Sequence, residues 1–204
     1  MVHLRASDPY PWPYDGVLEP RRCALVIAGA QLTWAEVSLG AADVLVVITE
    51  VAGALREAGG RVVALRHWAP PGGRHRTLPP ARDADGGELL VDLPLCDLVV
   101  SAGGTNGFHA SRLDAELRAR NLDRLVFCGF GAEVAVDSTL RAANDRGYEC
   151  LTLTDGTAPL EGHTGARALD SVTKSGGIFG AIAPAAALLE AVALASPPLA
   201  GVVA

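Results

Sequence analysis

Residues 124–143 have the layout of a strand-to-helix turn that presents a catalytic nucleophile. Residues 124–128 (RLVFC) form an apolar, strand-forming run, and Gly129 and Gly131 follow it before small and apolar residues at helical spacing. A turn of this kind lies at the carboxyl edge of a parallel sheet, where open α/β folds bind ligands. The helix N-terminus there would lower the pKa of a thiol. Ala135 carries no thiol, so the turn has the layout of an active site but lacks the nucleophile.

This segment resembles the motif G-hydrophobic-x-T-[DE]-V-C-V-x-x-T of the isochorismatase-like cysteine hydrolases. The positions in register are Gly129, Glu133, Val134, Val136 and Thr139. Ala135 falls on the nucleophilic cysteine of the motif, and Ala132 replaces its usual threonine. The resemblance implies a three-layer α/β fold with a mainly parallel sheet and a family activity of amide hydrolysis.

Two further motifs of this family can be placed on the chain. The first strand of the family ends in hydrophobic-D-x-Q-x-x-[FW], which is matched at Gln31 and Trp34, and Gly29 stands where the general-base aspartate belongs. The family also has a lysine six residues before the phenylalanine of an S-x-F-x-x-[TS]-x-L stretch. That stretch is matched at Phe108, Ser111 and Leu113. Ala102 then stands where the lysine belongs.

The three replacements bear on the chemistry that the resemblance implies. In the family the carboxylate takes the thiol proton, the thiolate attacks an amide carbonyl, and the lysine stabilises the charged partners. Gly29, Ala102 and Ala135 have no ionisable side-chain atom. Removing the nucleophile or the base from such a unit costs many powers of ten in rate. The resemblance therefore implies that ordinary cysteine-hydrolase chemistry is lost.

The chain is most similar to the family branch that contains biuret hydrolase and ureidoacrylate amidohydrolase. Shared stretches are residues 9–16 (PYPWPYDG), 143–151 (ANDRGYECL) and 176–181 (GGIFGA), while Ser175 replaces a glutamine that the branch often places against its substrate. The proline-rich arm is stiff and too apolar to extend freely into water. We expect it to pack against its own domain or a neighbouring subunit, and the resemblance implies an oligomer.

Several side chains near the expected mouth of the site are candidates to line a pocket. They are Gln31, Trp34, His67, Phe108, His109, Phe130, Gly131, Glu133 and Ser175. Three of them have a plainer alternative. His67 can simply pack a loop, His109 can face solvent or cap a helix, and Glu133 can complement the helix dipole. The histidines have no metal-ligand spacing, so we expect no metal and no cofactor.

Composition predicts one compact domain. The chain has 204 residues, 50% of them hydrophobic, and a net charge of −6. We expect a single domain over residues 1–204, with an extended arm at about 1–20 and an alanine-rich carboxyl-terminal tail. The absence of a long basic run argues against a nucleic-acid partner. Prolines and Glu190 interrupt the apolar run 178–204, so we expect a buried last helix rather than a membrane span.

The four cysteines do not form a disulfide framework in a chain of this length. Cys23, Cys128 and Cys150 lie in or beside predicted strands, where small buried thiols are typical, and Cys96 lies in a loop. Without a CxxC pair for zinc or an apolar signal sequence at the start, we expect a reducing cytoplasmic compartment.

Apolar periodicity predicts alternating strands and helices, which is typical of a parallel sheet covered on both faces. Strands are predicted at 24–28, 61–66, 98–100, 124–128 and 149–153, and a Pro/Gly-rich loop at 69–87. Helices are predicted at 43–58, 112–120, after Glu133, at 165–172 and at 185–195.

Three functions remain open from the sequence. The favoured one is a pseudoenzyme that acts as a structural or regulatory subunit, as a homo-oligomer or beside an active paralogue. The second is a protein that binds a small-molecule ligand in the pocket that glycine and alanine would enlarge. The third is a hydrolase or lyase of altered, cysteine-independent mechanism that uses Glu133, His109, Asp137 or a partner's side chain.

Overall fold

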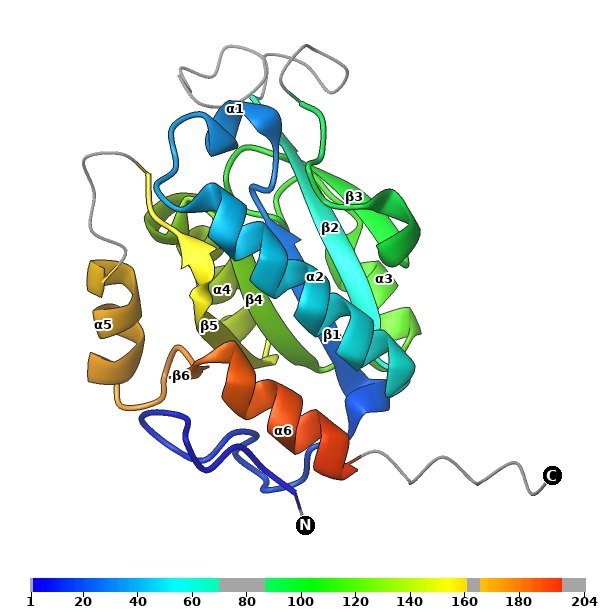
Figure 1. Cartoon of the computed structure of the whole chain (residues 1–204), viewed down its shortest axis with the longest axis vertical. Coiled ribbons are helices and arrows are strands. Elements are labelled where there is room, and N and C mark those ends of the chain that lie inside the picture. The colour runs from blue at the N-terminus through cyan, green and yellow to red at the C-terminus, as the bar shows by residue number, and fades with distance from the viewer. Residues whose placement is uncertain (1, 70–86, 161–165, 196–204) are drawn as a thin grey trace, which may run out of the picture.

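The computed structural model describes residues 2–69, 87–160 and 166–195 (Figure 1). The strands are β1 (Cys23–Ala28), β2 (Arg61–Trp68), β3 (Leu98–Gly103), β4 (Arg124–Phe130), β5 (Glu149–Ala158) and β6 (Ala181–Ala183). The helices are α1 (Leu32–Ala35), α2 (Ala41–Glu57), α3 (Leu113–Ala119), α4 (Asp137–Asn144), α5 (Ala166–Lys174) and α6 (Ala185–Ala195). A π-helical turn, Ala132–Val136, leads into α4, and short 3₁₀ turns occupy Pro20–Arg22 and Leu93–Leu95.

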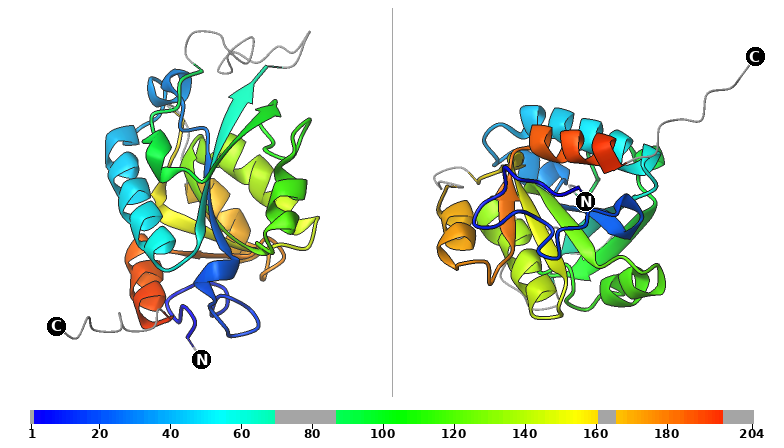
Figure 2. Two further views of the ribbon diagram at one scale, coloured as in Figure 1. Left: turned by 90° about the vertical axis from the view of Figure 1, so that its right-hand side faces the viewer. Right: turned by 90° about the horizontal axis from the view of Figure 1, so that it is seen from below.

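The strands form one parallel six-stranded sheet in the order β3-β2-β1-β4-β5-β6. Helices α2 and α6 cover one face of this sheet, and α3 and α4 cover the other (Figure 2). The predicted three-layer α/β architecture is thus confirmed. The order reverses between β1 and β4, so the carboxyl ends of these two central strands mark the topological switch point where ligands bind in such folds.

Most predicted elements are present with ends shifted by a few residues. Helix α6 begins and ends as predicted. Strand β5 continues to Ala158, beyond the predicted end at residue 153, so Asp155 and Gly156 lie inside the strand beside a register shift against β4. The three-residue β6 and the four-residue α1 were not predicted because neither is long enough to show a period. The expected loop at 69–87 and the carboxyl-terminal tail lie largely outside the described residues.

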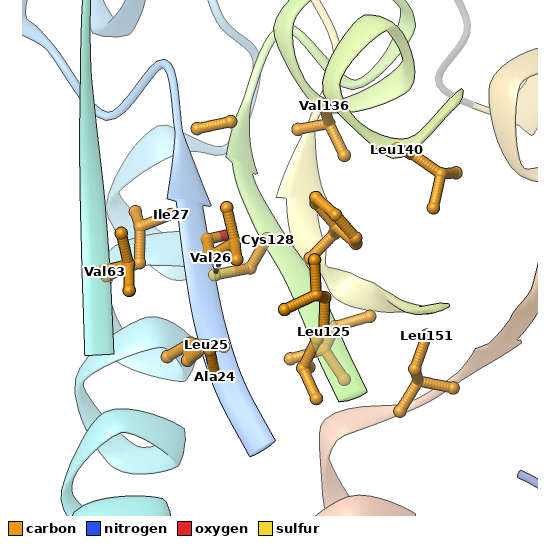
Figure 3. Close-up of a cluster of buried hydrophobic side chains, with 14 of the residues drawn as sticks. Ala24, Leu25, Val26, Ile27, Val63, Leu125, Cys128, Val136, Leu140 and Leu151 are labelled. Carbon is orange, nitrogen blue, oxygen red and sulfur yellow. Dashed lines mark hydrogen bonds between the residues drawn. The ribbon is translucent and has the colours of Figure 1, made fainter. Parts of the chain in front are cut away.

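The central strands are buried on both faces, which explains their continuous apolar sequences. Cys128 on β4 lies beside Val26 on β1, with its sulfur 3.8 Å from the Val26 carbonyl oxygen (Figure 3). Burial raises the pKa of this thiol far above its ordinary value. The prediction that Cys128 points into the core is confirmed, and the residue is therefore a poor nucleophile.

The N-terminal arm folds against its own chain at the amino edge of the sheet (Figure 2). Trp12 and Leu4 are buried there, and Asp8 pairs with Ile182 of β6 through two backbone hydrogen bonds of 3.0 and 2.8 Å. Of the two expected positions for the arm, packing on its own domain is the one observed. Tyr14 remains exposed.

Candidate functional site

The turn after β4 has the geometry that its sequence predicts, with one difference. Gly131 adopts a left-handed conformation (φ 64°), which glycine tolerates and which lets the chain reverse directly into a helix. The first helical turn, Ala132–Val136, is π-helical rather than α-helical, and such turns occur frequently at functional sites. The Thr139 hydroxyl donates to the Ala135 carbonyl (2.6 Å) and accepts from the Gly107 amide (3.0 Å). These bonds fix Ala135 beside the loop that follows β3.

Gly29 follows β1 at the same edge of the sheet, and its surroundings leave no room for a side chain. Its φ is +67°, and a Cβ added there would lie 2.6 Å from the Phe130 carbonyl oxygen and 2.7 Å from the Trp34 ring. A Cβ on Gly131 would overlap the same indole. The fully buried Trp34 side chain therefore fills the space between the two glycines.

Gln31 is buried and ties three segments together. Its Oε1 accepts from the His67 amide (2.7 Å), while its Nε2 donates to the carbonyls of His67 (3.1 Å) and Gly87 (3.2 Å). Residue 31 also pairs with Leu89 in an antiparallel bridge. Both polar atoms of the Gln31 amide bond to backbone groups, so this side chain has a structural role.

His67, near the end of β2, is buried against Trp34. The two rings stack with centroids 5.9 Å apart and an angle of 22° between their planes. Nδ1 lies 2.9 Å from the Gly104 carbonyl oxygen, and since a carbonyl only accepts, Nδ1 carries the proton of the neutral ring. Burial lowers the pKa of His67 to about 4, so the ring is neutral near pH 7.

Ala102 lies in β3 and is paired in register with His67. Ala102 and Ala135 are both fully buried, and Gly29 is buried as well. All three positions thus lie toward the carboxyl ends of the parallel strands, as the motif placement predicts. Trp34 occupies the space beside Gly29, and all three positions are buried, so the expected roomier pocket stays a prediction.

Two of the predicted pocket residues lie on the segment after β3. The Phe108 ring packs on Tyr148 (centroids 5.9 Å apart) and lies under the Arg146 guanidinium (4.7 Å), so it belongs to the packing before β5. The His109 side chain is exposed, which is its plainer alternative. Its backbone carbonyl accepts from the Gly103 amide (3.0 Å).

Two further candidates contribute to local structure. Ser175 follows α5 at the amino edge of the sheet, opposite Gly29; its hydroxyl donates to the Val172 carbonyl (2.6 Å) and accepts from the Phe179 amide (3.1 Å). It therefore does not face the site within this chain. Glu133 Oε1 accepts from the Leu160 amide (3.1 Å) and so holds the chain that leaves β5.

Neither a metal centre nor a membrane span emerges from the described segments. Within residues 2–69, 87–160 and 166–195, no group of three or more His, Cys, Asp or Glu side chains is arranged to hold a metal ion. In the same ranges, no helix combines the length and the apolar character needed to cross a membrane.

Known proteins similar to this chain agree with the geometry. Ureidoacrylate amidohydrolase RutB of Variovorax paradoxus is 44% identical over 66 residues, which are 32% of this chain and 26% of that protein. An uncharacterized isochorismatase family protein of Bacillus subtilis is 36% identical over 74 residues, 35% of this chain and 39% of that protein. The matches thus span between a quarter and two fifths of these relatives.

Solved structures and a family model extend the similarity to most of the chain. A cysteine hydrolase from Pseudomonas syringae superposes with a TM-score of 0.74 at 24% identity, covering 87% of this chain and 95% of that one. N-carbamoylsarcosine amidase from Thermoplasma acidophilum gives a TM-score of 0.64 at 22% identity, covering 80% and 96%. These two likenesses show the fold. The isochorismatase domain model matches residues 23–183, and the chain therefore belongs to the isochorismatase family.

Proposed function

We propose that this protein is a catalytically degenerate member of the family that serves as a structural or regulatory subunit. The observation that carries the proposal is the Trp34 indole, which fills the space beside Gly29 and Gly131. A base at position 29 would require a left-handed backbone and displacement of this ring. In the present arrangement of backbone and side chains, Trp34 and the Phe130 carbonyl thus occupy the space that a side chain at position 29 would need.

The two other functions are less well supported. A ligand-binding function needs an open pocket, and Ala102 and Ala135 are closed to solvent. A cysteine-independent hydrolase needs a free acid or base at this edge. His109 is exposed on the loop after β3, and Glu133 Oε1 is hydrogen-bonded to the backbone at Leu160.

As a subunit, the chain would associate with a second copy or with an active paralogue. Two large apolar side chains support this part of the proposal. Tyr14 on the arm is 78% exposed, and Ile178, between α5 and β6, is 71% exposed. They flank Tyr10, whose ring lies 5.4 Å from that of Tyr14 and would lie 3.1 Å from a Cβ on Gly177. Contiguous exposed apolar surface marks interaction sites, and these two side chains would form part of such a surface.

The test of the catalytic part is ammonia release from a panel of small amides and ureas, biuret and ureidoacrylate included. We expect no turnover by the unmodified protein. Ala135→Cys alone should remain inactive, because a thiol without a base stays protonated. The triple variant Gly29→Asp, Ala102→Lys, Ala135→Cys should also remain inactive and should unfold at a lower temperature, because a carboxylate side chain at position 29 would meet Trp34 and Phe130.

Two control variants make the result interpretable. Gly29→Ala measures the loss of stability that any side chain at position 29 causes, separately from the effect of a carboxylate. Cys128→Ser removes the thiol nearest to position 135 in the sequence. Turnover at about 1 per second or faster by the unmodified protein, the usual range for enzymes, would contradict the proposal if Cys128→Ser retained it. Activity in the triple variant would show instead that the space beside Trp34 opens readily.

A further inference from the structure

A small hollow lies between the turn after β4 and the neighbouring elements. Its walls come from the π-helical turn, α4, β5 and α5, and its volume for the centre of a water molecule is about 10 Å³. The wall is mostly apolar. Asp137, Thr152 and Thr157 contribute the polar side chains. The hollow is separate from the space that Trp34 fills, since neither Trp34 nor Gly29 lines it.

Two of these polar side chains have atoms that are buried without a protein partner. Thr152 is 2% exposed, and its hydroxyl oxygen has no hydrogen-bond partner among the described residues. The same holds for Asp137 Oδ1, although the other oxygen, Oδ2, accepts from Arg141 Nε (2.8 Å). Leaving a buried polar atom unpaired destabilises the folded state. Two such atoms on one hollow indicate a shared missing partner.

We propose that this hollow is a binding site for one ordered water molecule. Its volume corresponds to about one water-sized sphere, the minimum that holds a water. The water donates one hydrogen to Asp137 Oδ1 and bonds to the Thr152 hydroxyl, and Thr157 lies at the same wall as a third partner. A larger or wholly apolar ligand does not satisfy these atoms.

The water completes a polar connection across three elements. Arg141 Nη2 on α4 donates to Ser171 Oγ on α5 (2.9 Å), and the Arg141 guanidinium lies 4.1 Å over the Phe179 ring. Asp137 joins this group through Oδ2. The water extends this group of hydrogen bonds to Thr152 on β5. Helix α5 is thereby held to both α4 and the sheet, next to the turn after β4.

The change Thr152→Val tests the proposal because its two outcomes have opposite signs. With a water present, valine removes one of the bonds of that water and exposes Asp137 Oδ1 to an apolar wall, so the melting temperature should fall by about 2 to 4 °C. In a dry hollow, valine removes an unpaired hydroxyl at nearly constant shape, so the melting temperature would rise. Thr154→Val, on the same strand but away from the hollow, is the matched control and should shift it less.

A crystal structure that resolves ordered solvent gives the direct readout. We expect one density peak within hydrogen-bond distance of Thr152 Oγ1 and Asp137 Oδ1. In Ala132→Thr the added side chain should enter the hollow from the π-helical turn and replace that peak. An empty hollow in the unmodified protein, a peak bonded to neither atom, or a higher melting temperature for Thr152→Val would each overturn the proposal.

Discussion

His67 is an ionisable side chain that the fold has made part of the core. Its ring is stacked on Trp34, and Nδ1 donates to the Gly104 carbonyl. The neutral ring suits this environment because Nδ1 has an acceptor and the ring face packs on an indole, while Nε2 is buried without a hydrogen-bond partner among the described residues. A second proton would place an unpaired charge in the core, which is why burial lowers the pKa of His67.

This residue makes folding stability depend on pH. In the unfolded chain the pKa of His67 is near its ordinary 6.5, while in the folded chain it is about 4. Between these values the unfolded state binds a proton that the folded state does not, so stability falls as pH decreases from about 6.5 to about 4. The contribution is on the order of 3 kcal/mol across this window. Urea unfolding at a series of pH values measures it.

The variant His67→Asn isolates this contribution from that of the carboxylates. Asparagine keeps a donor for the Gly104 carbonyl and does not titrate, so its stability should depend less steeply on pH in the same window. His109→Asn changes an exposed histidine and serves as the control, with a slope like that of the unmodified protein. Equal slopes for His67→Asn and the unmodified protein would show that His67 is not held neutral.

Residue types along the chain predicted which positions meet at the carboxyl edge but not how they pack. The motifs placed Gly29, Ala102 and Ala135 correctly after or within parallel strands, because strand direction follows from the βα order. They did not predict that Trp34 would close the space, since this depends on the left-handed backbone at Gly29. The one available signal was Gly29, a glycine where the family motif has a larger residue. This signal is ambiguous, because the space beside the glycine can be either empty or filled by a neighbouring side chain.

Among the elements, the N-terminal arm depends most on specific polar contacts. Arg124, the first residue of β4, is 2% exposed and donates from Nη2 to Asp15 Oδ2 (2.6 Å). It also contacts Asp123 (3.3 Å). Tyr10 donates to Glu149, the first residue of β5 (2.8 Å). The arm is thus anchored at the amino ends of the strands, far from the candidate site.

Asp15→Asn should therefore weaken the protein and loosen the arm. The change leaves the buried Arg124 with Asp123 as its remaining acidic partner, so we expect a loss of about 1 to 3 kcal/mol in the free energy of unfolding. Glu50→Gln, on the exposed face of α2, is the control and should change it by less than about 0.5 kcal/mol. Amide hydrogen exchange should rise in residues 2–18 before it rises in the sheet. Unchanged exchange in the arm would contradict this anchoring.

The short elements show why sequence patterns give only part of the fold. Strand β6 pairs with β5 on one side and with Asp8 of the arm on the other, so its three residues are ordered by tertiary contacts. No period can be read from three residues. The π-helical turn before α4 is equally invisible in composition, because its alanine, glutamate and valine residues do not distinguish a π-helical from an α-helical turn. Longer elements were predictable from their patterns. The buried residues of α2 recur at helical spacing, and β4 is a continuous run that is buried throughout.

At the scale of the whole molecule, the amino edge carries the two most exposed large apolar side chains of the described residues, Tyr14 and Ile178. The arm covers much of this edge with Trp12 and Leu4. It leaves Tyr14 outward, next to the loop that carries Ile178. The carboxyl edge, in contrast, is closed at Gly29, Ala102 and Ala135. If the chain acts through association rather than catalysis, we expect the interface to lie on the surface around Tyr14 and Ile178.

We therefore predict that the protein is a dimer or larger assembly at micromolar concentration, measured by light scattering after size exclusion. The double change Tyr14→Ser, Ile178→Ser should shift the population toward monomer, because it removes the two most exposed large apolar side chains of this surface. Val46→Ser changes a side chain that is 68% exposed on α2 and should leave the assembly intact. A monomeric unmodified protein would refute self-association, and an active paralogue would then be the partner to test by co-purification. If Val46→Ser dissociates the assembly and the double variant does not, the interface lies on α2 instead.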